Sequence, residues 1–131
     1  MRGQWVEQYL DDVATLLGTD SGGVFVGDPV VRFTEDRSYG WLRVELEYHP
    51  SGNRLHIFLA VSVSSGAPDW RRYGFHYRGA GGRRIFTYDN APHHPELPAF
   101  PDHKHTGEGA VRGCDRPSIR DVLREALATS A

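Results

Sequence analysis

The stretch WLRVELEYHPSGNRLHIFLAVSV, residues 41–63, carries two apolar alternations separated by a turn. In its first half the even positions are apolar, and in its second half the odd positions are apolar. A period of two is typical of strands with one buried face, and the HPSGN segment between the halves is rich in turn-forming residues. These residues predict a β-hairpin whose apolar side chains all face one core.

Two further alternations follow, WRRYGFHYR at 70–78 and RRIFTY at 83–88, with SSGAPD and GAGG as turn segments. A slip of one residue would turn the apolar side chains outward, so the apolar faces constrain the register of an antiparallel meander. The register that we predict pairs Tyr48 with Leu55, Val61 with Tyr73, Phe75 with Phe86, His76 with Phe58, and Arg78 with His56.

Both ends of the chain show helical periodicity. Residues 4–17 and 118–128 carry apolar side chains at i, i+3, i+4 and i+7. Gly18 is expected to end the first helix, and Ser118 with Asp121 three residues later predicts the start of the second. With one more strand expected near 24–33, the sequence predicts an α+β fold. It consists of an antiparallel meander of about five strands, with the terminal helices packed on its apolar face.

Length and composition indicate one soluble domain spanning 1–131. The chain has 131 residues, 39% of them hydrophobic and 24% charged. No apolar run approaches the roughly 20 residues that span a bilayer, and the acidic, amphipathic N-terminus does not resemble a signal peptide. The single cysteine, Cys114, fits a reducing cytoplasm. The net charge of −2 disfavours a general nucleic-acid binder, although basic residues gather in the second half.

The segment RIFTYDNAPHHPELPAFPDHKH, residues 84–105, holds four of the seven histidines. Its four prolines favour a stiff, extended path over a helix or a central strand. Asp89 and Asn90 are good turn formers and are expected to structure the loop. Imidazoles change charge near neutral pH and also bind metals, so this segment is the candidate site.

Three interpretations of the segment remain open at the level of residue types. His103 and His105 flank Lys104, so both imidazoles face one way in a strand and could bind a metal. The lysine between them disfavours a cation, however, and we predict neither a metal nor another cofactor. Metal-free RNA cleavage needs a base, an acid and a cation. Candidates for these catalytic roles are His93, His94, His103, His105 and Lys104. The third interpretation is that the histidines only brace the loop.

The polar face of the predicted sheet supplies candidates for RNA binding. Arg72, His76 and Arg78 alternate with apolar residues, and Arg84 begins the next strand. Arginines can bind phosphates and an aromatic side chain can stack on a base. The alternative is an ordinary solvated face.

The run FTYDNAPHHPELPAFPDHKHTGE (86–108), followed by PSIRDVLREAL (117–127), resembles the TumE family of small toxins from bacterial toxin–antitoxin pairs. The resemblance also takes in GFHYRGAGGRRIFTYDNAPHH (74–94), so it covers roughly residues 40–128. Where the family often carries a histidine, this chain has Asp102.

The resemblance implies a cytoplasmic toxin made beside a neutralising antitoxin, typically a small helix-turn-helix protein. The resemblance is also compatible with a homodimer. Our leading hypothesis is a type II toxin that is a metal-independent ribonuclease. The alternatives are a non-enzymatic toxin or binding module with a structural loop, and a metal-dependent nuclease or phosphotransferase.

Overall fold

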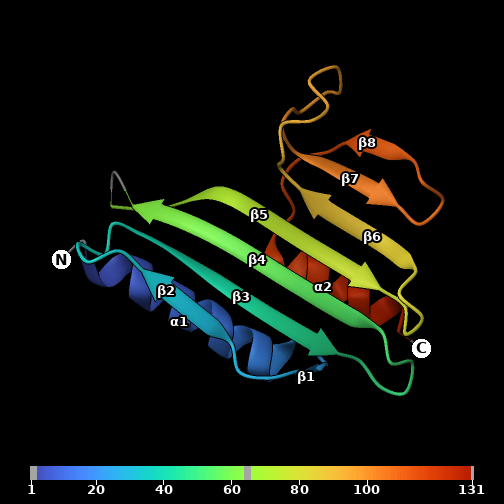
Figure 1. The fold of residues 1–131 in the computed structure, drawn as a ribbon, viewed down its shortest axis with the longest axis horizontal. Helices are drawn as coiled ribbons and strands as arrows, with labels where there is room; N and C mark the ends of the chain where they lie inside the picture. The colour runs from blue at the N-terminus through green and yellow to red at the C-terminus, as the bar shows by residue number, and fades with distance from the viewer. Residues whose placement is uncertain (1–2, 64–65, 131) are drawn as a thin grey trace.

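The computed structural model describes residues 3–63 and 66–130, and these form an eight-stranded antiparallel sheet with two helices (Figure 1). The predicted α+β class is therefore confirmed. In chain order the elements are α1 (Gly3–Asp20), β1 (Val24–Phe25), β2 (Val30–Phe33), β3 (Tyr39–Glu47), β4 (Arg54–Val63), β5 (Pro68–Arg78), β6 (Arg84–Asp89), β7 (His103–Thr106), β8 (Val111–Gly113) and α2 (Ile119–Ala128). Among the described residues, neither helix is long and apolar enough to cross a membrane.

The strand order β1-β3-β4-β5-β6-β7-β8 extends the predicted meander on both sides. The strand expected near 24–33 is two short strands, because both β1 and β2 pair with β3 along the same edge. Strands β7 and β8 were not expected. The proline-rich segment leaves β6 and returns the chain so that His103–Thr106 pairs with the strand it has just left. This return adds strands beyond the predicted meander.

The predicted register is wrong by two residues at each hairpin. Leu46 pairs with Leu55, Tyr73 with Leu59, and Phe86 with Tyr77. The first turn is tighter than expected, because the N–H of Tyr48 donates to the carbonyl of Asn53. A shift of two residues keeps every side chain on its predicted face, since strand side chains alternate with period two. Apolar alternation alone therefore cannot distinguish the two registers.

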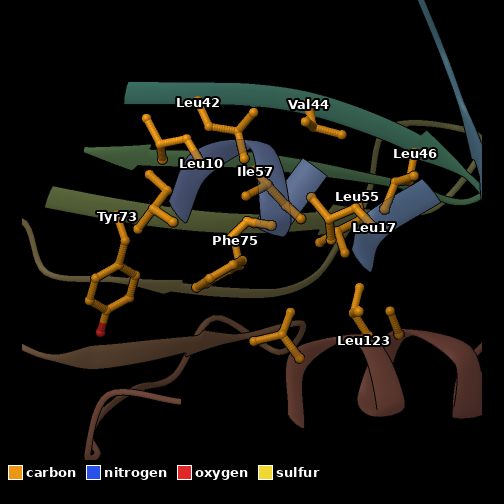
Figure 2. Close-up of a cluster of buried hydrophobic side chains, with 14 of the residues drawn as sticks. Leu10, Leu17, Leu42, Val44, Leu46, Leu55, Ile57, Tyr73, Phe75 and Leu123 are labelled. Atoms are coloured by element: carbon orange, nitrogen blue, oxygen red, sulfur yellow. The ribbon is translucent and has the colours of Figure 1, made fainter. Parts of the chain in front are cut away.

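One apolar core lies between the sheet and both helices (Figure 2). From α1, Leu10 and Leu17 are fully buried, and from α2 Leu123 packs against the same cluster. The helix α1 continues to Asp20, so the expectation that Gly18 ends it was wrong. Gly18 lies against the ring of Phe25, where a Cβ would be 3.1 Å from the nearest ring carbon. The glycine thus makes room for an aromatic ring within the helix.

The start of α2 shows the predicted capping interaction. Ser118 adopts an extended conformation and its hydroxyl accepts from the N–H of Asp121 at 3.0 Å. Replacement of Ser118 by alanine should lower the free energy of unfolding by about 1 kcal/mol, because that N–H loses its partner. Urea denaturation measures the change. Ser118→Asp, which keeps an acceptor, should retain most of the stability; an equal loss for both variants would show that the cap contributes little.

Candidate functional site

Five of the seven histidines gather on one side of the sheet. We call the sheet face opposite the helices the outer face. Cross-strand partners point to the same face, and the pairings of β3 to β7 give two parallel rows of side chains. One row contains Glu45, His56, His76, Thr87 and His105, and its neighbour contains Arg43, Phe58, Gly74, Asp89 and His103. The outer face thus collects side chains from five strands.

His94, His103 and His105 form a three-histidine cluster at one end of these rows. The ring centroids are 5.2 Å apart for His94 and His103, and 4.9 Å apart for His103 and His105. One nitrogen from each ring lies within 4.8 Å of the other two. The two β7 histidines share a face, as predicted for i and i+2 in a strand, and the loop supplies the third.

His103 is held from both sides of its ring. Its Nδ1 is 2.9 Å from the carbonyl oxygen of Pro101, and its Nε2 is 3.0 Å from Oδ1 of Asp89. The side chain is only 3% exposed. Both partners are oxygen acceptors, so each ring nitrogen faces a group that can bind it. His103 is therefore fixed in position and orientation.

Asp89 and Asn90 connect the loop to the sheet. Oδ1 of Asp89 also accepts from the N–H of Ala91 at 2.9 Å, and Oδ2 lies 3.9 Å from Nε2 of His105. The side chain of Asn90 accepts from the N–H of Tyr73 and donates to the carbonyl of Arg71. Asp89 thus has two tasks, because it shapes the turn and contacts the histidines.

The rest of the loop packs closely on β8. A Cβ at Gly113 would lie 2.0 Å from the carbonyl oxygen of Pro98, so only glycine permits this approach. Within the loop, the N–H of Leu97 donates to the carbonyl of His94. This packing brings the His94 side chain to the cluster. His93 is exposed and lies outside the three-histidine cluster.

Lys104 lies on the other face of β7. Its Nζ is 2.7 Å from Oε2 of Glu125 on α2, and the hydroxyl of Tyr88 donates to the same carboxylate. Burial lowers the pKa of Lys104, but the contacts with Glu125 and Tyr88 outweigh this, and the net pKa is raised. The alternation that brings His103 and His105 together therefore keeps the predicted catalytic lysine away from them.

Arg84 is the predicted RNA-binding residue whose charge acts on the cluster. Burial lowers the pKa of His105, and the charge of Arg84 is the next largest cause. Arg84 also helps to lower the pKa of His76, after burial, His56 and Arg78. Its Nε is buried and has no hydrogen-bond partner among the described residues. Arg84 is thus a cation near the imidazoles, and its Nε remains able to donate a hydrogen bond.

The other predicted RNA-binding residues lie along the outer face. Arg72 and Arg78 are exposed, and His76 is half-buried, with Nδ1 3.3 Å from the hydroxyl of Thr87. His76 lies beside His56, not opposite Phe58 as predicted, with ring centroids 6.2 Å apart. A hollow of about 490 Å³ opens over these two histidines. A larger hollow, of about 610 Å³, lies at α1 and has acidic side chains but no histidine in its lining.

The two central histidines should make stability depend on pH. Burial lowers the pKa of both His56 and His76; Arg43 adds to the effect at His56, and His56 adds to it at His76. Below the ordinary histidine pKa of 6.5, the unfolded chain therefore binds more protons than the folded one. The free energy of unfolding should fall as pH drops through that value.

Urea denaturation at about pH 7.5 and about pH 5.5 measures this dependence. Replacing His56 and His76 together by glutamine should reduce the fall between the two pH values, since neither position then titrates. The same change at the exposed His93 controls for the loss of a histidine outside this pair. An equal fall in the wild type and in the His56/His76 variant would contradict this account.

The fold and the site together define a small α+β protein whose open sheet face gathers histidines and arginines. Comparison with family models gives a match to Toxin TumE over residues 19–130. The chain belongs to the TumE toxin family, and a toxin role follows from this membership. None of the curated proteins and none of the solved structures compared with the chain matches it.

Sequence reasoning missed residues that complete the outer face. Trp41 is the first residue of the predicted alternation and shares the face of Arg43. Its odd position in a segment whose even positions are apolar was the available signal. Thr87 joins the two histidine groups, because it pairs with both His76 and His105. That link could not be found without knowledge of β7.

Proposed function

We propose that this protein is the toxin of a type II toxin–antitoxin pair and cleaves cellular RNA in the cytoplasm without a metal. The observation that carries the proposal is the convergence of the three-histidine cluster with Asp89 and Arg84. Two imidazoles and a guanidinium are sufficient for acid–base cleavage of a phosphodiester. Family membership supports the toxin role, and the chemistry of the cluster supports the reaction.

The reaction is transfer of the phosphate to the neighbouring ribose oxygen. A base removes the proton of the 2′-hydroxyl, and that oxygen attacks the adjacent phosphorus. The bond between phosphorus and the 5′-oxygen breaks, and an acid protonates the leaving 5′-oxygen. The products are a 2′,3′-cyclic phosphate and a 5′-hydroxyl, so neither water nor metal enters this step.

The geometry favours particular roles. His105 is the better base, because burial and then Arg84 lower its pKa, so that it is neutral near pH 7. His94 faces His105 with ring centroids 5.9 Å apart and serves as the acid. Arg84 stabilises the charge that develops on the phosphorane, in place of Lys104, which is paired with Glu125. His103, fixed by Asp89, positions the other two.

The test in cells is induction of the protein with and without the adjacent gene, followed by mapping of RNA ends. We expect growth arrest when the protein is induced alone, relief by a small antitoxin encoded nearby, and new RNA ends during arrest. Arrest without new ends would contradict cleavage and would support a non-enzymatic toxin that acts by occupying its target. Arrest that no neighbouring product relieves would contradict the pairing.

A metal-dependent nuclease is the second candidate, because three histidine nitrogens lie within 4.8 Å of one another. The contact of His103 Nδ1 with a backbone carbonyl is also typical of metal-ligating histidines. Elemental analysis of protein purified without an affinity tag distinguishes the two. A stoichiometric transition metal would overturn the metal-free mechanism, and its absence from active protein would exclude the metal-dependent one.

A further inference from the structure

An aromatic pair lies on the outer face beyond the histidines. The rings of Trp41 and Phe58 are 6.1 Å apart, on the adjacent strands β3 and β4. The guanidinium of Arg43 lies 5.6 Å from the Trp41 ring centroid and 5.2 Å from that of Phe58. Both rings are only half-buried. Two aromatic rings and an arginine thus face outward on a side of the sheet that neither helix covers.

The charge around this aromatic pair is positive. Arg32 and Arg72 lie in the same cross-strand row as Trp41, one on each side of it. Within the described part of the chain, neither of them forms an ion pair, and Arg43 forms none either. The two glutamates of β3 that share this face are both engaged by Arg54. A polyanion would therefore meet, on both sides of the rings, guanidinium groups that no carboxylate of the described residues pairs.

The aromatic pair is continuous with the three-histidine cluster. Phe58, Gly74, Asp89 and His103 are successive partners across four neighbouring strands. Three steps of about 4.8 Å put roughly 14 Å between Phe58 and His103. A Cβ at Gly74 would lie 2.7 Å from Nε2 of His76, so the glycine lets that imidazole lie over the strand. The path from Phe58 to His103 is lined by the imidazole ring of His76 and by Gly74, which has no side chain.

We infer that Trp41 and Phe58 form a base-stacking subsite for single-stranded RNA, with Arg43 and Arg72 binding the adjoining phosphates. The inference rests on the proposed function and adds the substrate class to it. Aromatic rings on an open sheet stack on unpaired bases, whereas a base inside a duplex is already stacked on its neighbours. The strand would cross the sheet from this subsite to the cluster, so the cleaved phosphate belongs to a single-stranded segment.

The experiment uses the full chain carrying His105→Ala, which prevents cleavage during the measurement. Fluorescence anisotropy of a labelled oligouridine gives the affinity. Adding Trp41→Ala and Phe58→Ala should weaken binding at least tenfold, since each base–aromatic stack contributes a factor of roughly 5 to 150. Phe33→Ala is the matched control. Phe33 is exposed, but it pairs with Gly40, which lies next to Trp41 on β3 and therefore belongs to the opposite face of the sheet. It should leave the affinity unchanged.

A second variant keeps the test valid if the aromatic changes disturb the fold. Arg43 and Arg72 are exposed, and replacing both by glutamine should reduce the dependence of log affinity on log salt by about 2. A blunt-ended RNA duplex should bind more weakly than the oligouridine. Equal affinities for duplex and single strand, or an aromatic variant that folds and binds normally, would overturn the inference.

Failure of the inference can be told from failure of the proposed function. If the wild type cleaves RNA but the aromatic variant binds normally, only the subsite is wrong. If the wild type does not cleave and the aromatic variant still loses affinity, the subsite stands and the reaction is wrong. If the aromatic variant keeps its RNA affinity but escapes neutralisation by the antitoxin, the surface binds protein and the inference is overturned.

Discussion

Replacement of His105 by alanine is expected to remove growth arrest and to lower RNA cleavage about 10²- to 10⁴-fold, the usual contribution of one acid–base group. The side chain lies in the cluster with its nitrogen 3.9 Å from Asp89, and it is the imidazole whose pKa burial and Arg84 lower. Alanine removes the proton acceptor without adding bulk to the sheet. Colony formation on induction and cleavage of RNA by purified protein measure the two effects.

The matched control is His93→Ala. His93 is one residue from the cluster member His94 in sequence, but it is exposed and lies outside the cluster. This variant should remain toxic, and both variants should show the circular dichroism and the unfolding transition of the wild type. A folded His105→Ala variant with full toxicity would disprove the role assigned to His105. Loss of toxicity in His93→Ala would place the chemistry elsewhere in the loop.

Replacement of Gly113 by alanine should reduce cleavage by about two orders of magnitude. Gly113 is the cross-strand partner of His103 and lies under the proline-rich loop. The added methyl would lie 2.0 Å from the carbonyl oxygen of Pro98 and would push the proline-rich loop away from β8. His94 is carried by this loop, so its imidazole would move relative to His105. A displacement of about 1 Å in a catalytic group costs on the order of 10²-fold in rate.

Gly81→Ala provides the comparison, because a Cβ at Gly81 would meet nothing within 4 Å. It should leave both toxicity and cleavage unchanged. Amide exchange across residues 90–102 should increase in the Gly113 variant and stay constant in the Gly81 variant. If Gly113→Ala cleaves RNA at the wild-type rate, the position of the loop does not control the site.

Apolar alternation predicted the four central strands, helical periodicity predicted both helices, and the two patterns predicted the faces that these elements bury. It could not fix the register, because a shift of two residues buries the same side chains. Leu46 therefore pairs with Leu55, whereas the prediction paired Tyr48 with Leu55. Strands β7 and β8 escaped prediction because HKHT and VRG carry no apolar alternation. The place of β7 in the sheet depends on pairing with β6, and that of β8 on pairing with β7, and the local pattern contains neither contact.

The candidate site was predicted in part. Strand alternation brings His103 and His105 to one face, and the same alternation carries Lys104 to the other, where Glu125 binds it. The sequence at positions 93–94 does not show which of the two histidines joins the cluster, because that depends on the approach of Pro98 to β8. The pairing of His56 with His76 required the true register.

The chemistry of the RNA ends tests the metal-free mechanism most directly. Purified wild-type protein is incubated with single-stranded RNA in excess chelator, and the ends of the fragments are identified by phosphatase treatment, polynucleotide kinase labelling and mass spectrometry. The mechanism predicts cleavage undiminished by the chelator, with 2′,3′-cyclic phosphate and 5′-hydroxyl ends that His105→Ala abolishes. Cleavage that stops in chelator, or fragments with 3′-hydroxyl and 5′-phosphate ends, would contradict it.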